Sequence, residues 1–525
     1  MELVLFLQSA ALVVTVHATQ FDEMSPFQVP IRDVQVLPDI PNSFMKGIAA
    51  TVGEPPQNIV LLPWPELNNT WIYDQAFCNR GCIDNSRCCQ ARRGNYYIES
   101  KSTTWVNTTN ITVAGGASTE TESQADTTIS KLITSSFGGT DTFTLNTTSD
   151  LADFPVGVPT VKWDDGPIML HAMGMGTNST ILNALFKAGR IGSRVWSIFW
   201  GRMWVDDDDA IDGSVVFGGY DEQKTIGRGY TQPLDFSEDS GCWTGMKVLI
   251  SKIALQDMNA NLLEPSVQLT ACIVPQHQLL LNGPSSIISN FELTTGMKIN
   301  NFSWGLHGGA YRYNTSALFD SDLTISLSIG LDIYIPSSQY LVPLVDIDNN
   351  GSRVVDKSQQ ELLIGVVHDS VTTLGRYFLT AAYLMVDLDA NTFTLWQAKP
   401  TSDSKLVSRY GNTAILNAGE SSRLSTGSLA GVVVGAVAGV AILGLGILFC
   451  FRRIHRPPRG SQTAMEPPNP THEANQLSEL PVLDTTKSSP TPKHELHGSP
   501  AAVSEMSGQT HHHTYEMDGG TLLLG

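Results

Sequence analysis

The sequence is poor in positive charge. It contains 32 Lys and Arg residues against 51 Asp and Glu residues, so its formal net charge is −19 at pH 7. Nucleic acid is recognised through clustered cations that neutralise phosphates, and this charge balance therefore argues against nucleic acid as a partner. The 525 residues are enough for two average domains with accessory segments, and a hydrophobic share of 42% is ample for a sizeable core.

Cysteine is also scarce, with seven residues in the chain. The seventh, Cys450, lies in an apolar run, where an inert thiol and a palmitoylated one are both open. The other six form an even number that suits disulfide bonds in an oxidising compartment. They are Cys78, Cys82, Cys88, Cys89, Cys242 and Cys272.

Two long apolar runs occur. The first, Leu3–Val16, predicts a signal peptide at residues 1–18, although no basic residue precedes it; a buried helix is the alternative. The second, residues 429–451, has 23 residues without a charge, and at about 1.5 Å per residue it spans a hydrocarbon layer of about 30 Å. Arg452 and Arg453 follow directly, so the positive-inside rule places the C-terminus in the cytosol.

We therefore expect a single-pass type I membrane protein of the secretory pathway, in the plasma membrane or the vacuolar membrane, with an extracellular or lumenal ectodomain. The N-x-[ST] sequons agree, because all eight precede the second run and none follows it. The candidate glycosylation sites are Asn68, Asn107, Asn110, Asn146, Asn178, Asn301, Asn314 and Asn350.

The segments beside the second run are polar. Residues 401–428 form a Ser-rich stem, and residues 452–525, rich in Pro, Ser, Thr and His, predict a disordered cytoplasmic tail that could recruit cytosolic partners. Three adjacent histidines in this tail, His511–His513, lack preorganised metal geometry, and we expect no metal or cofactor. Four glycines at four-residue intervals would give a smooth helix face for self-association, with ordinary glycine use in a membrane span as the alternative. They are Gly427, Gly431, Gly435 and Gly439.

Between the signal peptide and about residue 400, short alternating apolar segments with turn signals predict an all-β region with minor helices. A helix is expected at Asn178–Ala188, which starts with residues able to cap it and ends at Gly189. Examples of the expected strands are Asn58–Leu62, Gly213–Gly219, Lys247–Leu255, Leu323–Ile329 and Tyr383–Trp396.

Several motifs in this region follow the order of one family. They include GIAATVGEPPQN at Gly47–Asn58, MGMG at Met173–Gly176, GSVVFGGYD at Gly213–Asp221, the LLLNGP ending of Ala271–Pro284, and Ser370–Trp396. Together they resemble the pepsin-like (A1) aspartic peptidases over about 350 residues. The resemblance implies an all-β, bilobal pepsin-like acid-protease fold with an N-terminal lobe at residues 36–226 and a C-terminal lobe at residues 227–400.

The resemblance also implies two D-T-G-S or D-T-G-T loops, and neither position holds an aspartate. The first falls on Pro63 or Trp64 and the second on Pro275. Aspartic proteolysis needs two carboxylates about 3 Å apart that share one proton, whereas proline offers neither an acid nor an N–H. The family's flap tyrosine is missing as well, because residues 107–137 contain no Tyr or Trp.

Other residues near these loops could supply an acid or a base. Glu66 lies within the first loop, and Asp239 begins a D-S-G sequence, but we expect both to be solvated surface acids. His277 in the second loop is a candidate lone base, and a histidine satisfied by its neighbours is the alternative.

The family often has one local disulfide after the first loop. Four cysteines stand there in this chain, which suggests two bridges of open pairing, with zinc binding as an alternative that an oxidising compartment disfavours. Cys242 and Cys272 then remain as a pair that would tie the second-loop strand to its neighbour.

Three functions remain open. The preferred one is a membrane-anchored pepsin-like protein without peptidase activity, whose cleft binds an extended peptide or an extracellular ligand, or senses one. The second is an active aspartic endopeptidase with a non-standard acid pair. The third is a structural or stress-sensing surface glycoprotein with a vestigial cleft.

Overall fold

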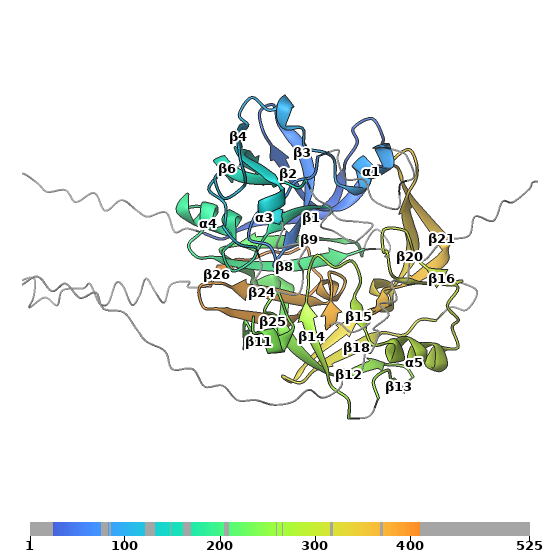
Figure 1. Cartoon of the computed structure of the whole chain (residues 1–525). Coiled ribbons are helices and arrows are strands. Elements are labelled where there is room, and N and C mark those ends of the chain that lie inside the picture. Colours follow the sequence, from blue (N-terminus) through green and yellow to red (C-terminus); the bar gives the residue numbers. More distant parts are fainter. Residues whose placement is uncertain are drawn as a thin grey trace, which may run out of the picture. The chain divides into compact units, whose positions relative to one another are not determined.

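The computed structural model describes residues 25–409 (Figure 1), except residues 75–81, 83–85, 121–131, 147–148, 161–169, 204–208, 259, 265, 315–318 and 368–370. All described residues belong to one unit of the chain, residues 1–427. The predicted signal peptide, the apolar run at 429–451, the tail, and the four spaced glycines lie outside the described residues. Within the described part, no helix is long and apolar enough to cross a membrane.

Strands dominate the described residues, as the all-β prediction requires. The largest sheet has 12 strands there, in the order β11-β25-β24-β8-β9-β1-β2-β3-β7, and β5 branches from β2 to pair with β4 and β6. Its strands are β1 (Phe27–Gln35), β2 (Phe44–Val52), β3 (Gln57–Trp64), β4 (Val106–Thr108), β5 (Phe137–Thr144), β6 (Asp150–Val158), β7 (His171–Gly174), β8 (Val195–Arg202), β9 (Ile211–Phe217), β11 (Thr225–Pro233), β24 (Ala382–Asp387) and β25 (Thr392–Ala398).

Two further sheets build the second half of the fold, in the lower and right-hand parts of Figure 1. One runs β19-β18-β12-β14-β23-β15-β22 with β13 beside β12, the other runs β16-β17-β21-β20, and β10 pairs with β26. Their strands are β10 (Gly219–Asp221), β12 (Lys247–Leu255), β13 (Ala260–Asn261), β14 (Leu269–Ile273), β15 (Leu281–Gly283), β16 (Asn301–Phe302), β17 (Tyr311–Asn314), β18 (Leu323–Leu327), β19 (Leu331–Ile335), β20 (Leu341–Ile347), β21 (Arg353–Leu362), β22 (Ile364–Val366), β23 (Thr372–Leu374) and β26 (Leu406–Ser408).

The strands follow the period-two pattern of their side chains. In β19, Leu331, Ile333 and Ile335 are buried while the two residues between them are exposed, because successive side chains point to opposite faces of a sheet. By contrast, β3 is buried at every position from Ile59 to Trp64, because it lies inside the large sheet with covered faces. The five strands predicted as examples all fall on observed strands, with Tyr383–Trp396 forming the β24–β25 hairpin.

The two halves of the fold repeat one strand arrangement. In the first, β3 lies between the antiparallel β2 and the parallel β7. In the second, β14 lies between the antiparallel β12 and the parallel β23. Each candidate loop follows the central strand of such a trio, so the sequence motifs occupy equivalent places in the two lobes.

Helices are short and few among the described residues. The predicted helix is confirmed as α4, where the Ser179 hydroxyl accepts a hydrogen bond from the Leu182 N–H at 3.2 Å and Gly189 follows with φ of 66°. The α-helices are α1 (Ser86–Arg92), α3 (Leu132–Ser135), α4 (Thr180–Lys187) and α5 (Ser285–Thr295), and the 3₁₀ turns are η1 (Glu99–Lys101), η2 (Glu222–Lys224), η3 (Glu238–Ser240), η4 (Ser337–Gln339) and η5 (Phe378–Thr380).

The β20–β21 hairpin of the second half reaches the first half beside α1 (Figure 1). Arg92 at the end of α1 is buried and forms an ion pair with Asp346 of β20. The Arg353 backbone N–H donates to the Asn42 carbonyl at 2.8 Å. The hairpin therefore joins the two lobes through both side-chain and backbone contacts.

Candidate functional site

The first candidate loop begins where β3 ends. Trp64 pairs with Gly174 across the parallel β3–β7 ladder, and its carbonyl accepts the N–H groups of Leu67 at 3.1 Å and Met175 at 3.0 Å. A side chain at Gly174 would bring a Cβ within 2.4 Å of the Asn69 carbonyl oxygen. The MGMG motif therefore has a steric reason: the loop backbone packs directly on it.

This loop is buried. Trp64 is 2% exposed, and it belongs to an apolar cluster with Leu67, Trp71 and Tyr73 of the same segment. Ile111 and Leu132, which come from the chain between β4 and β5, complete the cluster together with Ala172 of β7. Ile111 and Leu132, which belong to the stretch where the resemblance leads one to expect the family's flap, thus pack with the first loop in this structure.

Glu120 fixes this cover through hydrogen bonds to the loop. One of its carboxylate oxygens accepts the backbone N–H groups of Asn68 and Asn69 at 2.6 Å and 3.2 Å, and the other accepts the Asn69 Nδ2 at 2.7 Å and the Trp71 Nε1 at 2.8 Å. Burial raises the pKa of Glu120, and these four donors oppose that shift. No pattern in the sequence marks Glu120, because it lies in a polar stretch.

The prediction of a solvated Glu66 is wrong. Glu66 is 8% exposed, and its carboxylate accepts the indole N–H of Trp64 at 2.5 Å. It is buried because the whole loop packs beneath the cover, which the sequence did not indicate. Asp239 lies in η3 and is exposed, as expected.

The second candidate loop follows β14. The Val274 N–H donates to the Leu374 carbonyl of β23 at 2.8 Å, and the His277 N–H closes a turn onto the Val274 carbonyl at 2.9 Å. Pro275 is buried within that turn. Gln276 is 1% exposed, and neither polar atom of its side chain has a partner among the described residues.

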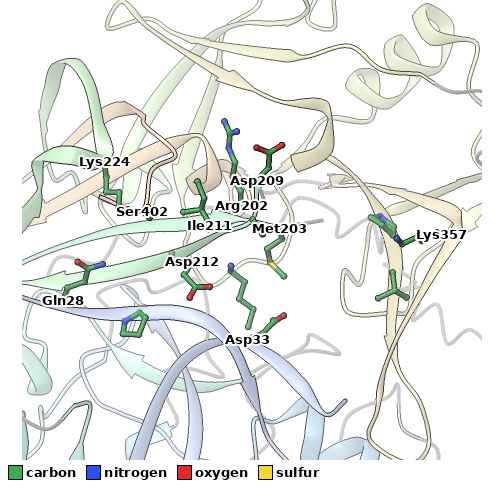
Figure 2. Close-up of a pocket in the computed structure, with 16 residues that line it drawn as sticks. Gln28, Asp33, Arg202, Met203, Asp209, Ile211, Asp212, Lys224, Lys357 and Ser402 are labelled. Atoms are coloured by element: carbon green, nitrogen blue, oxygen red, sulfur yellow. The ribbon is translucent and has the colours of Figure 1, made fainter. Parts of the chain in front are cut away.

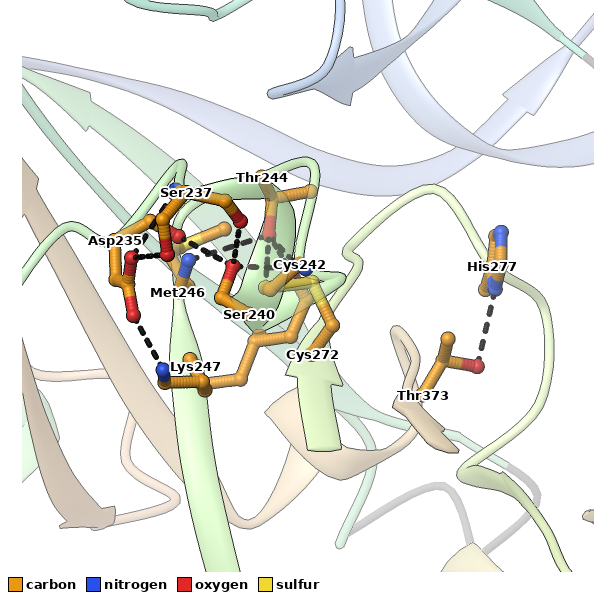
Figure 3. The surroundings of a disulfide bond; sticks show 11 residues. Asp235, Ser237, Ser240, Cys242, Thr244, Met246, Lys247, Cys272, His277 and Thr373 are labelled. Atoms are coloured by element: carbon orange, nitrogen blue, oxygen red, sulfur yellow. Dashed lines mark hydrogen bonds and ion pairs between the residues drawn. A yellow bond between two sulfur atoms is a disulfide. The ribbon is translucent and has the colours of Figure 1, made fainter. Parts of the chain in front are cut away.

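His277 is held as a neutral imidazole. Its Nδ1 lies 3.2 Å from the Thr373 Oγ1 (Figure 3). Burial and the nearby Arg376 guanidinium lower the pKa of His277 to about 4. The satisfied-histidine interpretation therefore fits the geometry better than a lone base does.

Arg376 stabilises the second loop through hydrogen bonds to its backbone carbonyls. Its guanidinium donates from Nη2 to the Gln276 carbonyl at 2.8 Å and from Nε to the His277 carbonyl at 3.3 Å. It is 6% exposed and has no acidic partner within the described residues, and burial lowers its pKa to about 10. No pattern in the sequence marks Arg376, which follows the L-G pair of the closing segment.

The disulfides agree with the cysteine pattern where they are described. Cys242 is bonded to Cys272 (Figure 3), and this bond joins the turn before β12 to β14. Cys82 is bonded to Cys88, and Cys89 is also disulfide-bonded. Cys78 lies outside the described residues, so the pairing of this group stays partly open. No cluster of three metal-ligating side chains occurs in the described part of the chain.

The glycosylation candidates differ in accessibility. Asn68 is 3% exposed, and its Nδ2 donates to the Thr119 and Glu120 carbonyls at 2.8 Å and 2.9 Å. An N-linked glycan has no room there, so the folded structure contradicts Asn68 as a site. The candidates with exposed positions are Asn107, Asn178, Asn301 and Asn350.

Residues 48–398 match the family model of the eukaryotic aspartyl proteases. The chain belongs to this family. Both candidate loops, the cover over Trp64 and Arg376 all fall within the aspartyl protease segment.

Among curated aspartic proteases, secreted aspartic protease 8 of Candida albicans is 24% identical over 253 residues, which cover 47% of this chain and 53% of that protein. The probable aspartic-type endopeptidase opsB of Aspergillus oryzae is 23% identical over 281 residues, which cover 52% of this chain and 54% of that protein. The chain thus spans about half the length of the curated relatives it matches. A crystal structure of an aspartic proteinase from Irpex lacteus superposes with a TM-score of 0.45 at 16% identity, covering 73% of this chain and 100% of that one.

Proposed function

We propose that this chain is an aspartyl protease family member without peptidase activity, and that it binds or senses a ligand at the junction of its lobes. The observation that supports the proposal is that the positions which the resemblance gives for the family's two aspartates, Pro63 or Trp64 in the first loop and Pro275 in the second, hold no acid. Each loop comes at or just after the end of the central strand of its trio, β3 and β14.

The chemistry supports the proposal. Peptide hydrolysis by this family needs one ionised carboxylate to activate water and one protonated carboxyl to polarise the carbonyl. Trp64 and Pro275 can do neither. Glu66 is the acid within the first loop, and it is buried in a hydrogen bond with the Trp64 indole. An endopeptidase with a non-standard acid pair is accordingly disfavoured.

One observation favours a second candidate, a structural glycoprotein with a vestigial cleft. Ile111 and Leu132 pack with the loop around Trp64 and Glu120 hydrogen-bonds to it, so among the described residues the first loop has little surface exposed to a ligand. Binding, where it occurs, is then expected on the side of the second loop and of Arg376.

Membrane anchoring and passage through the secretory pathway belong to the same proposal. The support comes from residues 429–451 with the arginines behind them, the sequons before them, and the disulfides of the ectodomain. The names of relatives such as secreted aspartic protease 8 agree with a secretory route. Resistance of the chain to alkaline carbonate extraction, together with a mass shift on deglycosylation, tests both points; extraction with the soluble fraction would contradict the anchor.

The test of the central proposal is a peptidase assay. The purified full chain is incubated with an unstructured substrate between pH 3 and pH 6, with and without pepstatin, beside an active aspartic protease as the positive control. We expect no pepstatin-sensitive turnover. Turnover that pepstatin blocks would overturn the proposal.

A further inference from the structure

The buried Arg376 and the half-buried Lys46 line a small cavity between the lobes, together with Arg353, which is paired with Asp33. The cavity has a volume of about 40 Å³, and its walls include Lys46 of β2, Trp200 of β8, Gln278 after the second loop, and Arg376. A buried charge is costly unless an opposite charge or several hydrogen bonds compensate it. The partners of these two cations therefore decide what the cavity can hold.

Arg376 has only part of its hydrogen-bonding capacity used. Its Nη2 donates to the Gln276 carbonyl, and its Nε donates to the His277 carbonyl. Its Nη1 makes no hydrogen bond within the described residues. The guanidinium stacks over the Trp200 ring at 5.3 Å from the ring centroid. A guanidinium has five N–H donors in a planar fork that fits a carboxylate, so donors remain for a ligand.

Lys46 is the second uncompensated cation. Its ammonium makes no hydrogen bond and no ion pair within the described part of the chain. Asp33 stands opposite it across the β1–β2 ladder, but that carboxylate is held by Arg353 through two hydrogen bonds. Burial lowers the pKa of Lys46 to about 8, while Asp33 and Asp212 oppose that shift, so the ammonium is still largely charged at neutral pH.

No acidic residue is among those that line the small cavity, and the acid behind its wall, Glu361, is already engaged. His307 lines the cavity, and its Nδ1 lies 2.6 Å from a Glu361 oxygen while its Nε2 lies 2.7 Å from the Tyr377 hydroxyl. Ser303 donates to the other Glu361 oxygen. Glu361 is 0% exposed and faces His307 and Ser303, so it is committed to these groups and not to the two cations.

We propose that this cavity binds the carboxylate group of a ligand, between Arg376 and Lys46. This inference rests on the proposed binding role and names the chemistry of its ligand. A volume of about 40 Å³ holds a few water molecules, or one carboxylate with the carbon that carries it. The rest of the ligand lies outside that volume.

A larger cavity, which shares wall residues with the small one, would be the route by which a ligand reaches it. It has a volume of about 1020 Å³ and shares Lys46 and Met203 with the smaller one. Figure 2 shows the residues that line it. Its charged wall residues have both signs, with Arg202 and Lys224 against Asp209 and Asp212. The larger cavity therefore does not select an anion by itself, and the selection falls to the smaller one.

The first experiment measures the thermal unfolding temperature of the purified full chain in detergent. Acetate is added up to 50 mM, and chloride at equal ionic strength and pH is the control, because screening alone acts on exposed charges. A ligand that binds only the folded state raises the unfolding temperature in a saturable way. We expect a saturable rise with acetate beyond that with chloride, and an equal response to both salts would overturn the inference.

Two variants locate the effect. Lys46→Met removes one cation but no hydrogen bond of the described structure, and it should weaken acetate binding about tenfold or more, since hydrogen bonds to charged groups are the strong ones. Leu306 also lines the small cavity, so Leu306→Phe should fill it by volume and abolish the response. Lys357→Met, at an exposed position that lines only the larger cavity, is the matched control and should respond like the wild type. Unchanged acetate affinity in both Lys46→Met and Leu306→Phe would contradict the site.

The source of the carboxylate is separated by two further probes. N-acetylglycine carries a C-terminal carboxylate, and N-acetyl-aspartate amide carries a side-chain carboxylate; asparagine in place of aspartate is the neutral control. The probe that competes with acetate identifies the source, and competition by the neutral control would overturn the assignment. Peptidase turnover is measured on the same samples. Turnover would contradict the proposed function, whereas the acetate titration alone decides whether the cavity binds a carboxylate.

Discussion

Arg353 of β21 binds Asp33 of β1 in a two-pronged ion pair, with Nη1–Oδ1 at 2.7 Å and Nη2–Oδ2 at 2.6 Å. The two residues are 320 positions apart, and the pair links the β20–β21 hairpin to the first lobe. Arg353 is more buried than Asp33, with side-chain exposures of 16% and 38%. A bidentate pair of this kind is among the stronger surface ion pairs.

We expect Asp33→Asn to lower the free energy of unfolding by about 1 kcal/mol, and the loss to shrink at high salt because screening weakens the pair. Urea unfolding at low and at high ionic strength checks this. Asp39→Asn, which breaks the more exposed pair with Arg87, is the control and should cause no measurable change. An equal loss in both variants would show that Asp33 has no special role.

Glu120 tests the cover over the first loop. The two carboxylate oxygens of Glu120 accept four hydrogen bonds, and Glu120→Gln replaces one of these oxygens by an NH₂ group. The N–H groups of that amide then face the N–H groups of the loop, so the free energy of unfolding should fall by about 1–3 kcal/mol. Glu264→Gln at an exposed position is the control and should be neutral. Chemical unfolding of both variants decides the matter, and a neutral Glu120→Gln would mean that the cover is held by its apolar contacts alone.

Trp64 separates packing from chemistry. Trp64→Asp gives this position the residue type of the family's first loop, but it places a carboxylate among Leu67, Trp71 and Ile111. We expect no peptidase activity and a loss of at least about 3 kcal/mol in the free energy of unfolding. Trp304→Asp is the matched control, because Trp304 is 65% exposed, and it should leave stability unchanged. A stable Trp64→Asp protein with turnover would reverse both conclusions.

The hydrogen bonds and burial of His171 predict that acid lowers the stability of the folded chain. Its Nδ1 accepts the Tyr73 N–H at 2.9 Å and its Nε2 faces the Asn95 carbonyl at 3.0 Å, so the neutral ring is the one that fits. Burial lowers the pKa of His171 to about 3. As the pH falls, the His171 ring is protonated near pH 6.5 in the unfolded chain, but only near pH 3 in the folded chain. The stabilisation is therefore complete above pH 6.5 and is lost as the pH falls toward 3.

Between pH 7 and pH 4 this residue alone should cost about 3 kcal/mol of unfolding free energy. Urea unfolding across that range measures the slope, and His171→Gln should flatten it. An unchanged slope in the variant would assign the acid sensitivity to other groups. Because the peptidase assay covers the same pH range, it should be accompanied by a measurement of folding.

Local patterns predicted the parts of the fold that local contacts determine. Strand β12 and helix α4 were predicted because their alternation and the Ser179 cap are visible over a few residues. Helix α5 was missed: its sequence SSIISNFELTT has a weak helical pattern, and its end depends on Gly296 in a left-handed conformation. The family motifs pointed to two segments that each follow the central strand of a strand trio, which composition could not have done.

The site was harder to predict because its partners are distant in the chain. Glu120 bonds to Trp71 from 49 positions away, and Arg376 reaches Gln276 from 100 positions away. Neither residue type is unusual where it stands, so nothing in the sequence marks it. The burial of Glu66 and Asn68 follows from the same cover and was missed for the same reason.

The apolar cluster around Trp64 also bears on how damage to this protein would be noticed. A residue at a reacting centre can be replaced while the protein still accumulates, and only its turnover suffers. Trp64 is a buried member of the apolar cluster in the interior of the first lobe, so its replacement should instead reduce the amount of protein that passes quality control. Variants at Trp64 would then differ in protein abundance, and no separate loss of catalytic turnover would be measured.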